Sequence, residues 1–411
     1  MRVTIVMGRG LEGCGVSKYS VEMAKYLRSH GHRYTIIASK DKSWSRKDAH
    51  IFDNLVHLKF ADDSNISTIV NICNASDMVI LNSLPSRPIG ASKGHDSKVG
   101  INFRKILDQV SKPVVLIQHD HNKLSIIRND GLEEVVNRSD IIFSHAPNND
   151  FVNEVKKIYG SIGLANFLDE NISEKRIFNF QPGMNFDDVR NTYWKSIEQT
   201  NPRVHRWIGR TTLWKGFELM FNFARNHLTP ASCLTVLEGI EKSPAFLDFK
   251  NKFEFNNLID KNPDNTDLTE YYGKLPVVFT LFKNAPLLER MSKTGFGYQL
   301  SNMDPKYIHH SIEYTHCEIV ASGATPVFRK EYGDSCTHFK YGDPLTSCSR
   351  TGTIWLSNDN MEECMNTIKM LENDSAMRDD WREMAFEFYK SHQNSEEVFQ
   401  RLFNTIFAEI T

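Results

Sequence analysis

The clearest chemistry in this sequence comes from an arginine and a lysine, Arg210 and Lys215, in one short stretch rich in basic, aromatic and glycine residues. Residues 204–208 are predicted to form a strand before them, and residues 218–228 a helix after them. Open α/β sheets bind their ligands at such strand-to-helix turns. Arginine offers a fixed fork of donors and lysine a mobile point charge, which together suit a diphosphate. An ordinary basic turn is the alternative.

A glycine-rich segment at 8–15 follows the first predicted strand and opens the first predicted helix. Glycines let a ligand approach the backbone closely, and the amides at a helix N-terminus attract anions. We therefore expect Gly13 and Gly15 to border the phosphates of a sugar-nucleotide donor. A dinucleotide cofactor would need an acid at the end of the second strand, where Ser39 and Lys40 stand instead. A tight turn without a ligand is the other alternative.

His119 and Asp120 follow a continuous apolar run at 113–117 that predicts a buried strand. Polar side chains at the carboxyl end of a parallel strand face the ligand site of such a sheet. A histidine beside an aspartate can exchange a proton with an acceptor hydroxyl, so we predict both residues to be catalytic. A hydrogen-bonded strand end is the alternative. A metal site is disfavoured, because His119 and His121 point to opposite faces of a continuing strand.

A glycine-rich tetrapeptide and a later glutamate predict further donor contacts. A turn that exposes backbone amides to a ligand is expected from Gly295, Phe296, Gly297 and Tyr298. Glu318 is predicted to begin a helix, and its carboxylate can accept both ribose hydroxyls of a nucleotide. The alternative is an N-terminal acid that only stabilises the helix dipole.

Composition limits the classes of partner. The formal net charge is −2, so contact with nucleic acid requires a local basic patch. The most promising patch interleaves basic and aromatic residues, and we predict DNA contacts by Lys40, Lys42, Trp44, Arg46 and Lys47. A solvated charged face is the alternative. Seven scattered cysteines without a C-x-x-C predict neither a zinc site nor a disulfide framework. The sequence also has no apolar run long enough to cross a membrane.

Short apolar runs alternate with helical stretches in both halves of the chain, which predicts parallel sheets covered by helices on both faces. The expected fold class is α/β, with two Rossmann-like domains facing a central cleft. The expected divisions are a first domain at 1–182, a linker at 183–202, a second domain at 203–385, and a C-terminal helix at 386–411 that can pack back on the first domain.

The chain resembles the DNA α-glucosyltransferases of T-even bacteriophages, which are retaining glycosyltransferases with two Rossmann-like domains (GT-B type). The motifs that carry the resemblance cover nearly the whole chain. They are R-G-L-E-G-C-G-V at 9–16, Q-H-D-H at 118–121, G-L-E-E at 131–134, F-S-H at 143–145, N-F-Q-P at 179–182, R-W-I-G-R-T-T at 206–212, W-K-G-F at 214–217, S-P-A-F at 243–246, L-E-R-M-S-K at 288–293 and E-Y-T-H at 313–316.

The resemblance implies transfer of a sugar from a UDP-sugar to 5-hydroxymethylcytosine in duplex DNA, with the α configuration retained and the base extruded. It also implies that the first domain is the acceptor or DNA side and the second domain the UDP-sugar side. Thr294 stands where retaining glycosyltransferases usually carry a glutamate that holds the donor sugar, so arabinose is an alternative to the favoured glucose. The acceptor base can also be one that is already glycosylated. No tightly bound cofactor is expected, and no catalytic divalent metal, because Arg210 and Lys215 supply positive charge. We expect a monomer without membrane contact in the cytoplasm of the infected host.

Other classes of protein remain open from the sequence. A glycosyltransferase with a carbohydrate or lipid acceptor would share the donor motifs but would not modify hydroxymethylated DNA. A DNA-binding protein with an inactive donor site would not bind UDP. An NAD-dependent oxidoreductase would bind its cofactor instead.

Overall fold

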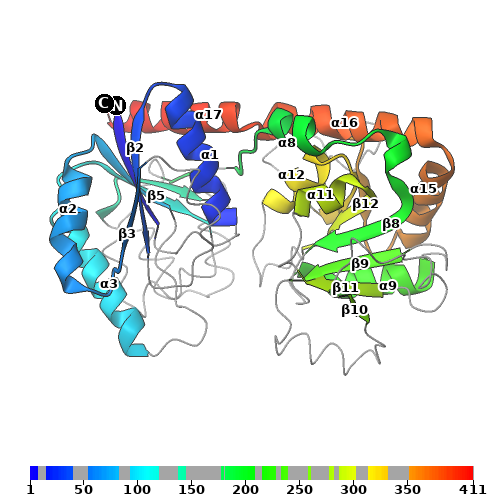
Figure 1. Cartoon of the computed structure of the whole chain (residues 1–411), viewed down its shortest axis with the longest axis horizontal. Helices are drawn as coiled ribbons and strands as arrows, with labels where there is room; N and C mark the ends of the chain where they lie inside the picture. Colours follow the sequence, from blue (N-terminus) through cyan, green and yellow to red (C-terminus); the bar gives the residue numbers. More distant parts are fainter. Residues whose placement is uncertain are drawn as a thin grey trace. The chain divides into compact units, whose positions relative to one another are not determined.

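The computed structural model describes residues 1–7, 15–39, 54–82, 93–119, 138–144, 177–179, 181–208, 215–227, 233–238, 258–260, 277–281, 287–301, 313–331 and 351–410 (Figure 1). The chain divides into two compact units, one of Met1–Gly183 with Ser395–Thr411 and one of Met184–Asn394. Each unit holds a parallel sheet with helices against it, which confirms the predicted α/β fold class.

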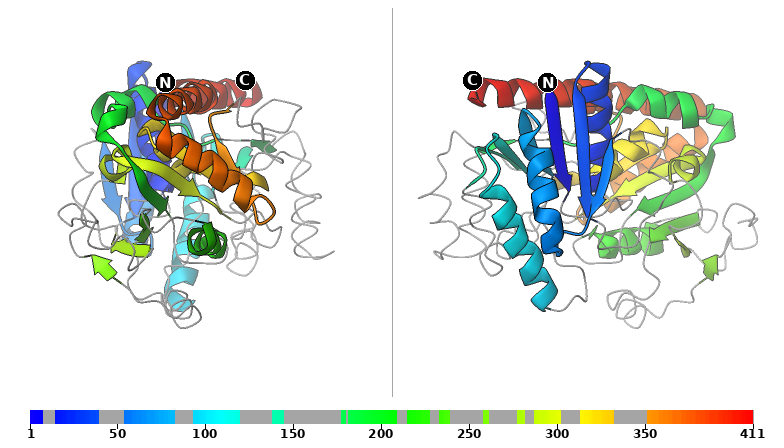
Figure 2. Two further views of the ribbon diagram at one scale, coloured as in Figure 1. Left: turned by 90° about the vertical axis from the view of Figure 1, so that its right-hand side faces the viewer. Right: turned by 60° about the vertical axis from the view of Figure 1, so that its left-hand side comes forward.

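The first unit contains one parallel sheet with the strand order β3-β2-β1-β4-β5-β6-β7. Its strands are β1 (Arg2–Met7), β2 (Arg33–Ser39), β3 (Leu55–Leu58), β4 (Met78–Asn82), β5 (Val114–Gln118), β6 (Ile141–Ser144) and β7 (Ile177–Asn179). One face is covered by α2 (Ile66–Asn74) and α3 (Lys93–Leu107), and the other by α1 (Gly15–Ser29) and α17 (Ser395–Ile410) (Figure 1, Figure 2). On the first of these faces, Val79 and Leu116 pack with Phe103 in a buried cluster.

The second unit contains a parallel sheet with the order β10-β11-β9-β8-β12-β13-β14. Its strands are β8 (Asn201–Ile208), β9 (Cys233–Glu238), β10 (Leu258–Asp260), β11 (Val277–Leu281), β12 (Thr294–Gln299), β13 (Thr325–Arg329) and β14 (Ile354–Leu356). Its helices are α8 (Phe186–Tyr193), α9 (Phe217–His227), α11 (Leu287–Ser292), α12 (Tyr314–Ala321), α15 (Met361–Asn373) and α16 (Ser375–Gln393). Trp207 and Tyr298 pack with Phe223 in a buried cluster against α9 and α15.

The strand order changes direction at one place in each sheet. In the first unit this place lies between β1 and β4, which end at Met7 and Asn82. In the second unit it lies between β8 and β12, which end at Ile208 and Gln299. Doubly wound sheets bind ligands outside the carboxyl ends of their strands at such a switch point. The side chains that follow these strands are therefore the first candidates for a functional site.

The predicted turn at Gly295, Phe296, Gly297 and Tyr298 is wrong, because these residues form the buried centre of β12. Their backbone pairs with β8 and β13 in the sheet instead of facing a ligand. A Cβ atom on Gly295 would lie 2.7 Å from the carbonyl oxygens of Asn201 and Pro202, and one on Gly297 would lie 2.5 Å from Ile319. The glycines therefore let β8 and α12 approach β12 closely.

The unit boundaries also differ from the sequence-based expectation. Residues 184–202, expected as a linker, contain α8 and belong to the second unit. The expected C-terminal helix is interrupted at Asn394, where the backbone is extended (ψ 131°), and this residue separates α16 from α17. In the first unit, α17 packs on α1, where the ring of Phe403 stacks on Tyr26 with centroids 5.6 Å apart.

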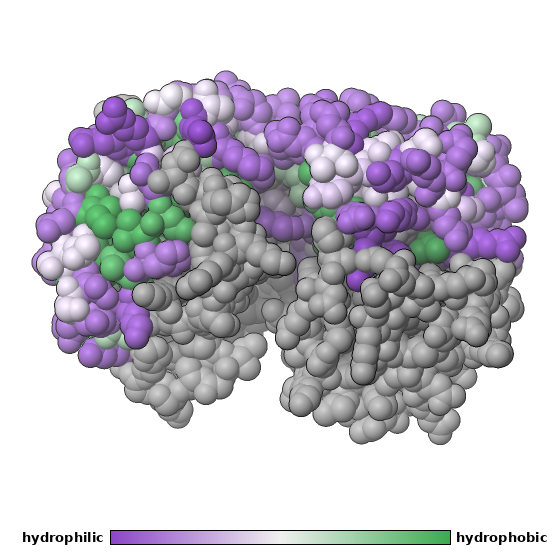
Figure 3. Space-filling view, in the orientation of Figure 1, coloured by the Kyte–Doolittle hydropathy of each residue, from purple (hydrophilic) through white to green (hydrophobic). Residues whose placement is uncertain are grey.

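Exposed apolar side chains of the first unit gather beside α2 and β3 on the face shown in Figure 3, where Leu55, Val56 and Ile72 are partly exposed. Within the described ranges, no helix has the length and apolar character needed to cross a membrane.

Candidate active site

Lys215 lies two residues before the start of α9, and its ammonium group contacts a carboxylate. Nζ of Lys215 donates to Oε2 of Glu313 at 2.5 Å, and the two side chains are only 14% and 18% exposed. Glu313 directly precedes α12, so this ion pair joins the start of α9 to the N-terminus of α12. Water screens the pair less than it screens a surface pair. The lysine predicted to meet a diphosphate is thus held at the carboxyl edge of the sheet.

The end of β12 supplies two further partners for the Glu313 carboxylate. Nε2 of Gln299 donates to Oε2 at 2.8 Å, and Oγ of Ser301 donates to Oε1 at 2.8 Å. Gln299 and Ser301 are fully buried. With Lys215, these donors suit an ionised carboxylate, which is an acceptor only. If Lys215 moved to a diphosphate, the Glu313 carboxylate would still accept the hydrogen bonds from Gln299 and Ser301.

Gly216 determines how closely the Lys215 turn approaches β12. Its φ is +71°, and a Cβ atom would lie 1.6 Å from the carbonyl oxygen of Leu300. Gly216→Ala is therefore expected to strain the backbone by at least about 1–3 kcal/mol and to displace Lys215 from Glu313, so that turnover falls sharply. Turnover assays and urea denaturation check this. Gly31→Ala is the matched control, since Gly31 has the same φ of +71° with nothing within 4 Å. Equal loss of turnover in both variants would contradict the expectation.

His316 holds the backbone of Glu313 through a neutral ring. Nδ1 of His316 accepts a hydrogen bond from the backbone N–H of Glu313 at 3.0 Å, which requires an unprotonated Nδ1. Burial lowers the pKa of His316 to about 4, although the nearby carboxylate of Glu313 acts in the opposite direction. Lys215 lowers the pKa further. The ring is therefore neutral at ordinary pH and supports the N-terminus of α12.

This depressed pKa makes the free energy of unfolding depend on pH. Between about pH 6.5 and 4, the unfolded histidine binds a proton that the folded one does not. The free energy of unfolding should therefore fall as pH falls, by at most about 1.4 kcal/mol per pH unit from this group. His316→Gln should flatten that slope while retaining an acceptor. Urea denaturation of both proteins at several pH values tests the expectation, and identical slopes would rule it out.

A buried arginine anchors the other end of α12. Nε of Arg382 in α16 donates to the carbonyl oxygen of Gly323 at 2.5 Å, and Nη2 donates to that of Lys195 at 2.9 Å. Its guanidinium also lies 4.7 Å from the ring centroid of Trp194. The arginine is 2% exposed. It ties α12 to α16 and to the segment after α8, which keeps Glu313 at a defined place.

Glu318 lies within α12 and not at its start, so its predicted place at the helix N-terminus is wrong. Glu313 takes that place, and Glu318 follows by more than one helical turn. The Glu318 side chain is buried, at 3% exposure. Glu313 thus caps the start of α12, and Glu318 lies within the helix.

In the first unit, His119 follows β5 directly and is half-buried. Its Nε2 lies 2.6 Å from Oδ1 of Asn82, the last residue of β4. Its ring meets that of Tyr19 edge-on, with centroids 5.2 Å apart. Tyr19 belongs to α1, which begins at Gly15. The structure therefore places His119 beside the switch point of the first sheet, against the helix that follows the glycine-rich segment.

The other predicted site residues lie outside the described ranges. They are Gly13, Lys40, Lys42, Trp44, Arg46, Lys47, Asp120 and Arg210.

Sequence reasoning missed Glu313 and Asn82 as site residues, although signals for both exist. Glu313 is an acid at the start of the apolar stretch that contains Glu318, which marks the true N-terminus of that helix. Asn82 ends an apolar strand, as His119 follows one, and the carboxyl ends of parallel strands share one edge. Gln299 was missed because it ends a strand with two glycines, a segment that was predicted to be a turn.

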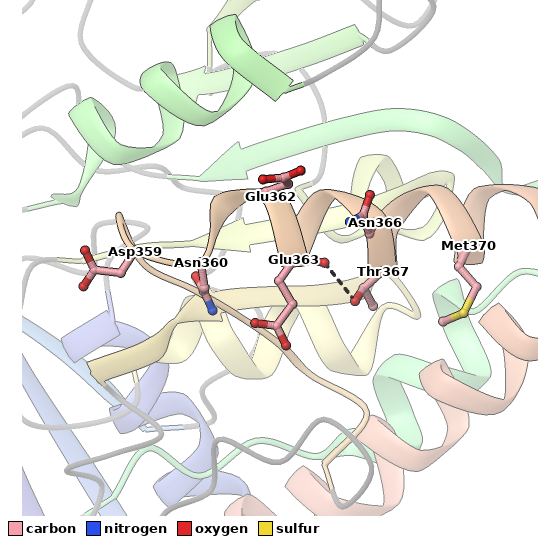
Figure 4. Close-up of a pocket in the computed structure, with 7 residues that line it drawn as sticks. All are labelled: Asp359, Asn360, Glu362, Glu363, Asn366, Thr367 and Met370. Atoms are coloured by element: carbon pink, nitrogen blue, oxygen red, sulfur yellow. Dashed lines mark hydrogen bonds between the residues drawn. The ribbon is translucent and has the colours of Figure 1, made fainter.

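Two other features of the described residues bear on ligand binding. No group of three or more His, Cys, Asp and Glu side chains that could hold a metal ion occurs among them. A hollow of about 600 Å³ lies at the start of α15, and Figure 4 shows the exposed side chains of Glu362, Glu363 and Asn366 among those that line it. Its acidic lining disfavours a diphosphate.

Known proteins match this chain over almost its whole length. The family model described as DNA alpha-glucosyltransferase matches residues 14–376. The DNA alpha-glucosyltransferase of Enterobacteria phage T4 is 40% identical over 99% of this chain and 100% of its own length. An alpha-glucosyltransferase in complex with UDP and a 13-mer DNA containing an HMU base is 37% identical, with a TM-score of 0.82 and 99% of each chain covered. A structure with UDP-glucose and DNA containing an abasic site has the same identity, score and coverage.

Proposed function

We propose that this chain, which belongs to the DNA alpha-glucosyltransferase family, transfers glucose from UDP-glucose to the hydroxymethyl group of 5-hydroxymethylcytosine in duplex DNA. The configuration at the anomeric carbon stays α. The observation that carries the proposal is the Lys215–Glu313 pair at the carboxyl edge of β8 and β12. It supplies a positioned cation for a diphosphate in a chain whose relatives bind UDP, UDP-glucose and DNA.

The bond that breaks joins the anomeric carbon of glucose to the β-phosphate of UDP, and the leaving UDP gathers negative charge. A positioned ammonium group stabilises this charge more in the transition state than in the ground state. Lys215 is assigned this role together with Arg210, and Glu313 places the ammonium before UDP-glucose arrives. Gly13 and Gly15 are assigned contacts with the phosphates, and Glu318 contacts with the donor.

Because lysine and arginine supply the positive charge, a divalent metal is not needed for that role in this proposal. Turnover is therefore expected to be unchanged when EDTA replaces magnesium in the assay. Loss of activity in EDTA, restored by magnesium, would assign part of the charge stabilisation to a metal ion.

The bond that forms joins the acceptor hydroxyl oxygen to the anomeric carbon, and the hydroxyl proton must leave. His119 with Asp120 is assigned to accept or share this proton, and an oxygen of the departing phosphate is the alternative acceptor. A paired base keeps its hydroxymethyl group in the duplex groove, so extrusion of the base is expected at a cost of a few kcal/mol.

DNA contacts are proposed for Lys40, Lys42, Trp44, Arg46 and Lys47. Neutralising phosphates with lysine and arginine makes affinity fall with salt, so Lys42→Ala should weaken DNA binding and reduce its salt dependence. We propose that the enzyme acts as a monomer in the cytoplasm of the infected bacterial host.

Nucleoside mass spectrometry tests the reaction directly. The protein is incubated with hydroxymethylcytosine DNA and either UDP-glucose or UDP-arabinose, and unmodified DNA is the control. A hexose adduct only on the modified DNA is expected. A pentose adduct would keep the mechanism and change the donor. No adduct with either donor, despite UDP binding, would point to a pre-glycosylated base or to a carbohydrate or lipid acceptor.

A further inference from the structure

We propose that Asn82 is a positioning residue that fixes which ring nitrogen of His119 carries the proton and how the ring is oriented. The effect on turnover rests on the proposed function of His119. The hydrogen-bond geometry of Asn82 and His119 does not depend on that function. Asn82 is the last residue of β4, is 1% exposed and lies beside His119 at the carboxyl edge of the sheet.

The hydrogen bonds of Asn82 determine the orientation of its amide. Nδ2 lies 3.0 Å from the carbonyl oxygen of Val16 and 2.5 Å from Oγ of Ser20, both in the first turns of α1. A backbone carbonyl can only accept, so the amide nitrogen and not the oxygen must face Val16. Both amide hydrogens are then directed to α1, and Oδ1 faces His119.

This orientation determines the tautomer of His119. Oδ1 of Asn82 can only accept, and it lies 2.6 Å from Nε2 of His119. Nε2 must therefore donate, and in the neutral ring Nδ1 becomes the acceptor nitrogen. Tyr19 supports the ring edge-on, and Phe399 of α17 packs on Tyr19 with centroids 5.0 Å apart. The contact with Asn82 thus holds the ring in one tautomer, in which Nδ1 is the nitrogen that can accept a proton.

The first test measures the tautomer in the full-length protein by ¹⁵N NMR of labelled histidine. The His119 signals are assigned by their loss in His119→Gln. The expected wild-type spectrum shows a protonated Nε2 and an unprotonated Nδ1. Asn82→Leu removes the acceptor for Nε2 and should give a mixture of tautomers. A proton on Nδ1 in the wild type, or an unchanged tautomer in Asn82→Leu, would overturn the proposal.

The second test separates positioning from folding by kinetics. Asn82→Leu is expected to lower kcat by about 10- to 100-fold while the KM for UDP-glucose stays within about twofold, as for other residues that orient a functional histidine. Asn102→Leu is the matched control, because Asn102 is equally buried in the same unit and bonds the carbonyl oxygen of Phe60 at 2.9 Å. An equal loss of kcat in both variants would show that Asn82 only supports the fold, and would contradict its role in positioning His119.

The two tests also distinguish this proposal from the proposed function. If His119→Gln retains full turnover, the catalytic role of His119 fails, and the wild-type NMR spectrum still decides whether Asn82 sets the tautomer. If Asn82→Leu does not fold, the wild-type spectrum still decides the question, because a proton on Nδ1 of His119 would overturn the proposal.

Discussion

Lys215→Ala is expected to lower kcat by about 100- to 1000-fold, the usual effect of removing one positioned group that stabilises charge in the transition state. The ammonium lies in a largely buried pair with Glu313 at the edge where a donor diphosphate is proposed to bind. DNA binding should change little. Steady-state turnover with hydroxymethylcytosine DNA and a filter-binding assay with the same DNA measure the two effects.

Lys293→Ala is the control for Lys215→Ala, because Lys293 forms an exposed pair with Glu289 at 3.5 Å in the same unit. Exposed pairs contribute little to stability, so this variant should behave as the wild type. Lys215→Arg keeps the positive charge but replaces the ammonium by a planar guanidinium. This variant should recover part of the activity. Wild-type turnover in Lys215→Ala would remove the lysine from the mechanism.

His119→Gln is expected to lower kcat by about 100- to 10,000-fold, the range for loss of a group that transfers a proton in the transition state. Glutamine can still donate to Asn82 through its amide but cannot take a proton. UDP affinity should be unchanged, because His119 lies at the edge of the first sheet and is not assigned to the donor. Turnover assays and calorimetric UDP titration measure the two quantities.

His30→Gln is the comparison for His119→Gln, because His30 lies in the same unit and pairs with Glu396 on α17 at 2.9 Å. It should leave kcat unchanged. A fall in UDP affinity as large as the fall in kcat of His119→Gln would assign His119 to donor binding instead of proton transfer.

Much of the fold is predictable from local patterns, and β12 shows where they fail. Continuous apolar runs such as 78–81 and 114–117 predict buried strands, because both faces of a parallel sheet are covered. The two glycines of β12 are typical of turns, yet they are required because β8 and α12 approach that strand too closely for a Cβ atom. A glycine kept for close packing and one kept for a turn look the same in a sequence.

The site was likewise only partly predictable. Lys215 and His119 were identified from residue type and position after a strand, because strand ends face the ligand in this class of fold. Their partners were not identified, since Glu313 follows Lys215 by almost a hundred residues and Asn82 belongs to a different strand from His119. The parallel register of β4 and β5 brings Asn82 beside His119, and the packing of the α12 start against the end of β12 brings Glu313 to Lys215.

The sequence by itself therefore determined the α/β class, the family and the residue types that can hold a diphosphate or move a proton. These properties depend on hydrophobic periodicity and on motifs that are contiguous in the chain. The tertiary structure alone decided which carboxylate holds Lys215 and which amide orients His119. Those choices depend on contacts between strand ends and helix termini far apart in sequence, and only the packed sheet sets their distances.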